Sequence, residues 1–176
     1  MRKSVRRPGV RDGYDRWAES YDATSNPLVA LDRRHTPRLL QPRRGERMLD
    51  VACGTGAYLG AMARAGSRPV GLDLSRGMLQ VARRKYRDIP VAQADLNQAL
   101  PVRTAAFDAV VCALVGEHLT NLRLVFGSCA AASCAAGDSS SRSSTRRWPP
   151  PASKRTSRRT ASSTGSARCD TRSTTT

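Results

Sequence analysis

Aromatic and acidic residues are scarce in this chain, and no long apolar run occurs in it. Phe, Trp and Tyr make up 5% of the 176 residues, and 14 Asp and Glu stand against 30 Lys and Arg. No segment approaches the roughly 20 apolar residues of a membrane-spanning helix. The N-terminus is basic but lacks the apolar run of a signal peptide. We therefore expect a cytoplasmic protein with no membrane partner.

The cysteines and histidines lack the spacing of a metal site. Five Cys and two His are present, but no C-x-x-C pair occurs, and His35 and His118 form no zinc-like pattern with the cysteines. Cys53 and Cys112 lie in apolar contexts at the ends of expected strands. We expect free thiols in a reducing compartment and no bound metal.

The last 50 residues, from Gly127, contain little that could form a core. Ser and Thr dominate them, and Trp148 is their only large apolar residue. Such a stretch buries too little apolar surface to offset an ordering cost of roughly 1–2 kcal/mol per residue. Residues 1–11 are expected to form a disordered basic arm. This leaves one domain over residues 12–126, followed by a low-complexity tail at 127–176.

Within that domain the sequence predicts alternating strands and helices. Strands are expected at 48–51, 69–72, 89–94 and 107–114. A helix follows the first strand and ends at Gly66, a plausible left-handed cap, and Ser75 is a candidate N-cap for the next helix. Continuous apolar strands fit a parallel sheet that is covered on both faces. The fold class is α/β, a Rossmann-like doubly wound parallel sheet of three layers that is incomplete.

Helical signals also precede the first strand. Tyr14, Trp17 and Tyr21 fall on one face of a helix over residues 12–23. Packing of this face on the core is the simpler interpretation, and an aromatic lid over a ligand pocket is the alternative. Asn26-Pro27 begins a second helical stretch, and Thr36-Pro37 gives a third start signal.

A glycine turn after the first strand marks the candidate site. Gly54 and Gly56 let the backbone come within contact distance of a ligand, and ligands of such sheets bind beyond the carboxyl ends of the strands. Asp50 lies in the first strand, and Asp73 and Asp95 end the second and third. Asp73 follows the turn by about 20 residues and could accept both hydroxyls of a ribose. Asp95 could accept from an adenine amino group. Taken singly, each could equally be a helix cap or a solvated turn residue.

Two ligand classes compete for this turn. The dinucleotide fingerprint G-x-G-x-x-G has Leu59 at its last glycine position, which disfavours an NAD or flavin enzyme. The alternative is an acidic-x-small-x-G-x-G turn, present here as Asp50-Val-Ala52-Cys-Gly54-Thr-Gly56. A non-enzymatic nucleic-acid binder that uses the basic arm and tail is a further alternative. The tail lacks interleaved aromatics and any recognition motif, which disfavours specific nucleic-acid binding.

The motif Leu-Asp-Val-Ala-Cys-Gly-Thr-Gly at residues 49–56 resembles the first motif of the class I S-adenosylmethionine-dependent methyltransferases. It is most similar to the small-molecule group related to the ubiquinone and biotin pathway enzymes. Residues 71–79 resemble the second motif of that family, 93–96 the third and 107–111 the fourth, and residues 14–22 resemble its N-terminal lid helix. The resemblance covers about residues 12–126.

This resemblance implies S-adenosylmethionine as cofactor and a small-molecule methyl acceptor, and it implies a role for each motif residue. Asp73 would bind the ribose hydroxyls. The other cofactor-binding residues fall into four groups: Asp50, Ala52, Gly54 and Gly56 at the methionine part, Leu74 and Met78 against the adenine with Asp95 and Leu96 at its edge, Ala113 and Leu114 beside the methyl donor, and Tyr14 and Tyr21 on the lid.

One position departs from the family pattern, and one histidine is a candidate for catalysis. Ala52 stands where many members carry glycine, which we interpret as a mild change. The sulfonium of the cofactor is already activated, so that positioning supplies much of the rate and a general base is optional. His118 is the only plausible general base, and a surface or core histidine is at least as plausible.

The resemblance stops near Phe126, where a Ser/Ala/Arg/Pro/Thr mixture begins. GC-rich coding DNA gives such a mixture when it is read out of frame. Back-translation of residues 128–141 with the frame shifted back by one nucleotide can spell a helix, a turn and a strand. We predict an out-of-frame tail, with a genuine disordered basic tail as the alternative. The fourth strand would then be an exposed edge, and this chain would bind cofactor with little or no turnover.

Overall fold

The computed structural model describes residues 9–133, so that residues 1–8 of the predicted arm and the predicted tail from residue 134 lie outside the described residues. The described elements, in chain order, are α1 Val10–Trp17, the short 3-10 turn η1 Tyr21–Ala23, α2 Pro27–Leu40, β1 Arg47–Val51, α3 Ala57–Arg64, β2 Arg68–Asp73, α4 Arg76–Lys85, β3 Val91–Gln93, β4 Ala109–Cys112, η2 Gly116–His118 and α5 Leu122–Ala132.

The four described strands form one parallel sheet in the order β3-β2-β1-β4. β1 lies in the middle, with Leu49 opposite Val70 of β2 on one side and Val110 of β4 on the other. The chain crosses from β1 to β2 through α3 and from β2 to β3 through α4. The predicted Rossmann-like α/β fold is confirmed.

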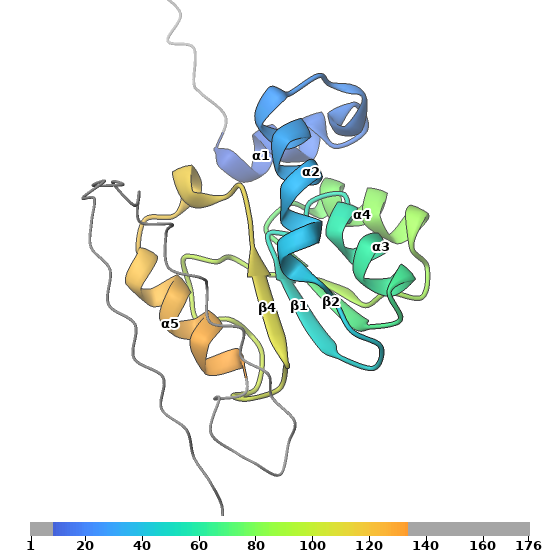
Figure 1. Cartoon of the computed structure of the whole chain (residues 1–176). Coiled ribbons are helices and arrows are strands. Elements are labelled where there is room, and N and C mark those ends of the chain that lie inside the picture. The colour runs from blue at the N-terminus through green and yellow to red at the C-terminus, as the bar shows by residue number, and fades with distance from the viewer. Residues whose placement is uncertain (1–8, 134–176) are drawn as a thin grey trace, which may run out of the picture. The chain divides into compact units, whose positions relative to one another are not determined.

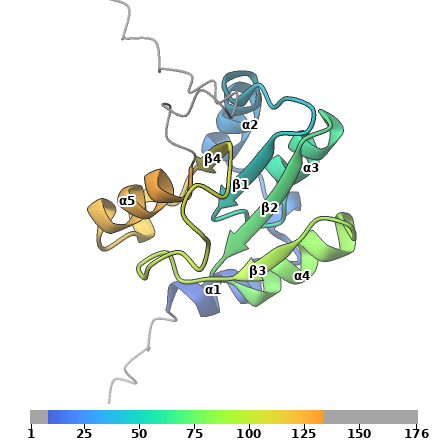
Figure 2. The ribbon, with the colours of Figure 1, turned by 90° about the horizontal axis from the view of Figure 1, so that it is seen from below.

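Helices cover both faces of this sheet, as Figures 1 and 2 show. Successive side chains of β1 point to opposite faces. Leu49 and Val51 pack with Val125 of α5 on one face, and Met48 packs with Leu59 of α3 on the other. The three layers expected from the continuous apolar runs are therefore present.

The segment before β1 differs from the prediction in two ways. α1 begins at Val10 and ends at Trp17, and Tyr21 opens a separate 3-10 turn, so the single helix expected over residues 12–23 is wrong. α2 starts at Pro27 as predicted, and the Asn26 side chain caps it by accepting from the amides of Leu28 and Val29. The third helix start at Thr36-Pro37 is wrong, because α2 continues through Pro37. The Thr36 hydroxyl instead donates to Asp32, one turn earlier, at 2.5 Å.

The last described helix crosses the predicted end of the domain. α5 runs on from residue 126 to Ala132, which is buried, and an isolated parallel bridge joins Ser133 to Phe107. β4 is the edge strand of the described sheet, next to β1. The boundary that we placed at about residue 126 thus lies within a helix, and the origin of the tail stays a prediction.

Candidate functional site

A cavity of about 300 Å³ lies at the carboxyl ends of β1, β2 and β4. This volume is at the small end of the range of ligand pockets. Twelve of the residues assigned to the cofactor or to catalysis line it together: Tyr14, Tyr21, Ala52, Gly54, Asp73, Leu74, Met78, Asp95, Leu96, Ala113, Leu114 and His118. Asp50 and Gly56 do not line it. The motifs thus converge on one site although they are spread over more than 100 residues.

The glycine turn is held open toward this cavity. Gly54 has φ +53°, and a Cβ built there meets no atom within 4 Å, so its backbone borders open space in the cavity. Ala52 has φ +67°. A left-handed backbone costs a residue with a Cβ about 1–2 kcal/mol relative to glycine. The alanine at this position is therefore strained, and our interpretation of it as a mild change is corrected.

Asp73 joins the end of β2 to the glycine turn. Its Oδ2 accepts from the amide of Gly54 at 2.8 Å, and its Oδ1 accepts from the amide of Ser75 at 2.8 Å. Burial raises the pKa of Asp73, against the effect of these backbone hydrogen bonds. Each carboxylate oxygen can accept more than one hydrogen bond. The side chain therefore remains able to accept from a diol in the cavity.

Gly56 has a different role from Gly54. Its φ is +86°, and a Cβ there would lie 3.0 Å from the ring of Tyr86. Gly60, one turn into α3, would place a Cβ 2.5 Å from the hydroxyl of the same ring. Both glycines make room for Tyr86 at the end of α4. The assignment of Gly56 to the cofactor stays a prediction, and the structure places it on the side of the turn that packs against α4.

Asp50 is buried in the middle of β1. Its side chain is 1% exposed, and its Oδ2 has no hydrogen-bond partner among the described residues. Burial, and then the nearby carboxylates of Asp73 and Asp32, raise the pKa of Asp50 to about 8. An acidic group held in this way favours a proton or a cationic partner.

α1 and η1 bring an aromatic cluster over the cavity. The rings of Tyr14, Trp17 and Tyr21 contact one another, with centroids 4.8–6.3 Å apart. The hydroxyl of Tyr14 lies 2.9 Å from Nε2 of His118, and the two rings meet edge to face. Tyr14 and Tyr21 line the cavity and also pack on the buried Ala18. These aromatic side chains therefore both pack on the core and line the cavity, so that each of the two interpretations, core packing and lid, holds in part.

No local sequence pattern marks the residues that anchor this segment. Asp15 accepts from Ser75 Oγ at 2.6 Å and from the amide of Gly77 at 2.8 Å, and so caps the N-terminus of α4. The hydrogen bond from Ser75 lowers the pKa of Asp15. Asp22 binds three other segments. A carboxylate that contacts residues about 60 positions away leaves no local pattern from which to predict it.

α2 and α3 add polar groups that the sequence did not single out. Tyr58 donates a hydrogen bond to Asp32, and both line the cavity with Arg33. Burial, and then the hydrogen bond to Asp32, hold the pKa of Tyr58 above its usual range. Asp32 follows no motif, and its position depends on the way in which α2 packs on α3.

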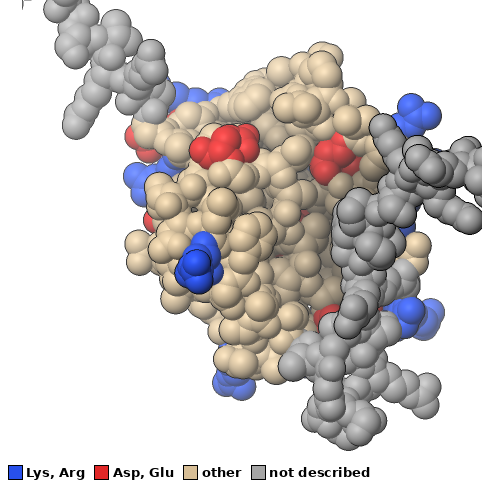
Figure 3. Space-filling model, turned by 60° about the vertical axis from the view of Figure 1, so that its left-hand side comes forward, with Lys and Arg blue, Asp and Glu red and all other residues tan. Residues whose placement is uncertain are grey.

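Residues 9–133 contain no group of three or more His, Cys, Asp and Glu side chains that could hold a metal. Among the same residues, no helix has the length and apolarity to cross a membrane. Lys and Arg on the face in Figure 3 lie mostly at its margin, separated by uncharged residues. Where grey residues do not cover it, that face shows no basic patch of the kind that binds a nucleic-acid backbone.

The parallel sheet, its glycine turn, the acidic residue at the end of β2 and the cavity beyond them define a Rossmann-like domain with a site for a nucleoside-containing ligand. A family described as "Methyltransferase domain" matches residues 49–135. This match, the relatives and the solved structures below agree with the motifs. Residues 49–135 thus contain a methyltransferase domain similar to those of the class I S-adenosylmethionine-dependent methyltransferases.

Two relatives and one solved structure illustrate the similarity. Demethylmenaquinone methyltransferase of Tropheryma whipplei (strain Twist) is 32% identical over 119 residues, which are 65% of this chain and 50% of the relative. Malonyl-[acyl-carrier protein] O-methyltransferase of Serratia marcescens is 34% identical over 122 residues, 68% and 46% of the two chains. The crystal structure of an S-adenosylmethionine dependent methyltransferase from Mesorhizobium loti has 28% identity and a TM-score of 0.52, over 56% of this chain and 47% of that one. This chain spans about half the length of the curated relatives it matches.

Proposed function

We propose that this domain binds S-adenosylmethionine in the 300 Å³ cavity and transfers its methyl group to a small-molecule acceptor. One observation carries the proposal: Gly54, Asp73 and Asp95, from three separate motifs, line a single cavity at the carboxyl end of the sheet. The names of the two relatives, which refer to demethylmenaquinone and to a malonyl group on a carrier protein, support the acceptor class.

The residues present fit this cofactor. The carboxylate of Asp73 is oriented by two amides and can accept from the ribose hydroxyls. Leu74, Met78 and Leu96 offer an apolar slot for the base, and the open backbone at Gly54 leaves room for the amino-acid part. Once bound, the cofactor supplies a methyl group already activated on a sulfonium, so that this chain has to position the reactants and exclude water.

His118 stays our candidate for holding a proton of the acceptor. It lines the cavity, and its Nε2 lies 2.9 Å from the Tyr14 hydroxyl. Which of the two atoms carries the hydrogen depends on the tautomer of the ring. A histidine in this position can take a proton from an acidic acceptor hydroxyl, while Tyr14 keeps the ring in one orientation.

The alternatives have less support. Leu59, at the third glycine position of the dinucleotide fingerprint, is fully buried in the core, and its methyl group lies 2.9 Å from where a Cβ on Gly71 would stand. This position thus serves core packing of α3 on β2. Little or no turnover by this chain stays a prediction, as does its cytoplasmic location.

Calorimetric titration with S-adenosylhomocysteine tests the proposal, because this demethylated product of the cofactor measures binding apart from turnover. We expect Asp73→Ala to weaken binding at least tenfold, since hydrogen bonds to a charged group contribute about 1.5–3 kcal/mol each. Asp88→Ala, at an exposed position after α4, is the matched control and should bind like the wild type. Equal affinity of Asp73→Ala and wild type, with both folded by circular dichroism, would contradict the proposal.

A further inference from the structure

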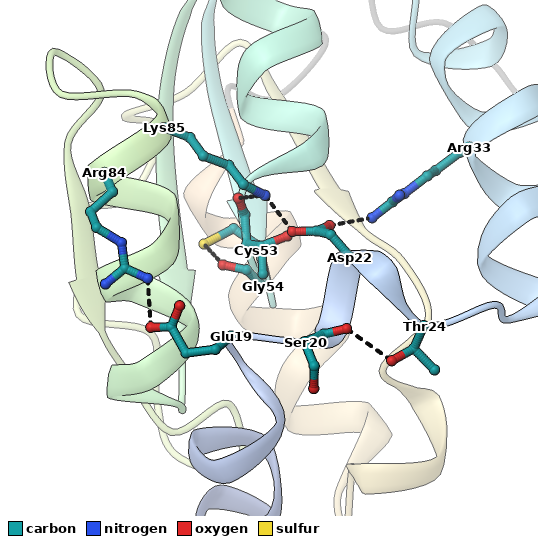
Figure 4. A network of polar contacts seen from close by, with 10 residues as sticks. Glu19, Ser20, Asp22, Thr24, Arg33, Cys53, Gly54, Arg84 and Lys85 are labelled. Atoms are coloured by element: carbon teal, nitrogen blue, oxygen red, sulfur yellow. Dashed lines mark hydrogen bonds and ion pairs between the residues drawn. The ribbon is translucent and has the colours of Figure 1, made fainter.

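Asp22 lies where three segments of the chain meet. Its Oδ1 accepts from Arg33 Nη2 of α2 at 2.9 Å and from Thr55 Oγ1 of the glycine turn at 3.0 Å. Its Oδ2 accepts from Lys85 Nζ at the end of α4. Figure 4 shows Arg33 and Lys85 reaching Asp22 from opposite sides. One carboxylate thus receives three donors from elements that are far apart in the sequence.

Two of the three donors to Asp22, Thr55 and Arg33, belong to residues that line the cavity. Thr55 stands between the two glycines of the turn, is 2% exposed and lines the cavity. Lys85 Nζ also lies 3.4 Å from the carbonyl oxygen of Thr55, which fixes the turn from a second direction. Tyr21, the neighbour of Asp22 in the chain, lines the cavity from the other side. The carboxylate of Asp22 therefore connects the aromatic segment that carries Tyr21 to the glycine turn that carries Thr55.

The nearby ion pair of Glu19 and Arg84 is a surface contact with which the contacts of Asp22 can be compared. Glu19 and Arg84 lie 2.6 Å apart, but their side chains are 74% and 57% exposed and neither contacts the glycine turn. Exposed pairs of this kind contribute little to stability. Asp22 differs because its side chain is only 34% exposed and one of its donors is a buried hydroxyl.

We propose that Asp22 is a positioning residue that holds the lid segment, defined as residues 10–23, and the glycine turn, residues 52–56, in one arrangement. The cavity then forms as a unit, because the position of Tyr21 and that of Thr55 depend on the same carboxylate. Binding of a ligand by the glycine turn is thereby coupled to order in the lid segment. The inference rests on the proposed function only for the identity of that ligand.

Hydrogen exchange of the full chain, followed by mass spectrometry, tests the connection without any ligand. Asp22→Asn keeps the size of the side chain and removes its charge. We expect faster exchange in peptides from both the lid segment and the glycine turn. Glu19→Gln is the matched control, a neutralised carboxylate in the same segment, and should leave the glycine turn unchanged. Unchanged exchange of the glycine turn in Asp22→Asn would overturn the proposal.

A second pair of variants keeps the test decisive if Asp22→Asn folds poorly. Thr55→Val removes only the hydroxyl that donates to Asp22, and Thr55→Ser retains it. We expect Asp22→Asn to weaken binding of S-adenosylhomocysteine about tenfold, a typical size for coupling between sites. Thr55→Val should show part of that loss, and Thr55→Ser should recover it.

The two readouts separate the two proposals. If the wild type does not bind S-adenosylhomocysteine, the proposed function fails, while the exchange of the glycine turn still decides the role of Asp22. If the wild type binds and Asp22→Asn binds as tightly as Glu19→Gln, the coupling proposed for Asp22 is wrong.

Discussion

Gly77 allows the lid segment to pack directly on α4. A Cβ at this position would lie 2.8 Å from the carbonyl oxygen of Asp15, 3.0 Å from its Cα and 3.1 Å from the Cβ of Ala18. Two of these atoms belong to the backbone of α1, so no side-chain rotation relieves the overlap. Gly77→Ala should therefore push α1 away from α4 and loosen the cover of the cavity.

The magnitude follows from two opposing effects. Alanine is better than glycine within a helix by at most about 1 kcal/mol, and Gly77 lies in the first turn, where the gain is smaller. Against this, the displacement loosens the hydrogen bonds of Asp15 to Ser75 Oγ and to the Gly77 amide. Bonds to a charged group contribute about 1.5–3 kcal/mol each when fully formed. We expect a net loss of about 2 kcal/mol in docking of the lid segment.

Gly127→Ala provides the matched control, since Gly127 also lies within a helix but a Cβ there meets nothing within 4 Å. Urea unfolding measures the global change, and hydrogen exchange of residues 10–23 measures lid docking. Gly127→Ala should raise the free energy of unfolding by about 1 kcal/mol, while Gly77→Ala should speed exchange of the lid segment. A gain in stability at Gly77 equal to that at Gly127, with unchanged exchange, would refute the packing argument.

Two further predictions concern the first strand and its turn. Ala52→Gly should raise the free energy of unfolding by about 0.5–1 kcal/mol, because relief of the left-handed strain exceeds the added entropy of glycine in the unfolded chain. Urea titration measures this change, with Ala63→Gly, at an exposed site inside α3, as the control that should lose stability. A loss of stability in both variants would contradict the prediction. The pKa of Asp50 is raised from 3.8 to about 8 in the folded state, which therefore keeps a proton that the unfolded chain releases. The free energy of unfolding should therefore fall as pH rises from about 4 to about 8. Asp50→Asn should remove this pH dependence of the free energy of unfolding. An unchanged pH dependence in the variant would show that Asp50 does not cause it.

The local part of the fold and site was predictable from the sequence. Gly54 and Ser75 act within a few residues of their own strand or helix end, where turn and cap chemistry leaves a pattern, and Asp73 follows the glycine turn at a recognisable spacing of about 20 residues. The cap at Ser75 is confirmed by the hydrogen bond that its hydroxyl accepts from the amide of Met78. Gly66 likewise adopts the predicted left-handed conformation.

What the sequence did not predict depends on packing between distant elements. Asp15 and Asp22 act on residues that lie 11–63 positions away, so no short pattern marks them. The helix start predicted at Pro37 failed because the packing of α2 outweighs the local preference of proline for a first turn. The strain at Ala52 was hidden for a similar reason, since the φ angle of a residue in a turn depends on how both flanking elements are held.

The central claim is that the cavity between the glycine turn and the lid segment is a site for S-adenosylmethionine. Calorimetric titration of the wild-type chain with S-adenosylmethionine and, separately, with NAD tests this most directly. We predict one site per chain for S-adenosylmethionine and no measurable heat with NAD. Binding of NAD in place of S-adenosylmethionine, or binding of neither by the folded chain, would contradict the claim.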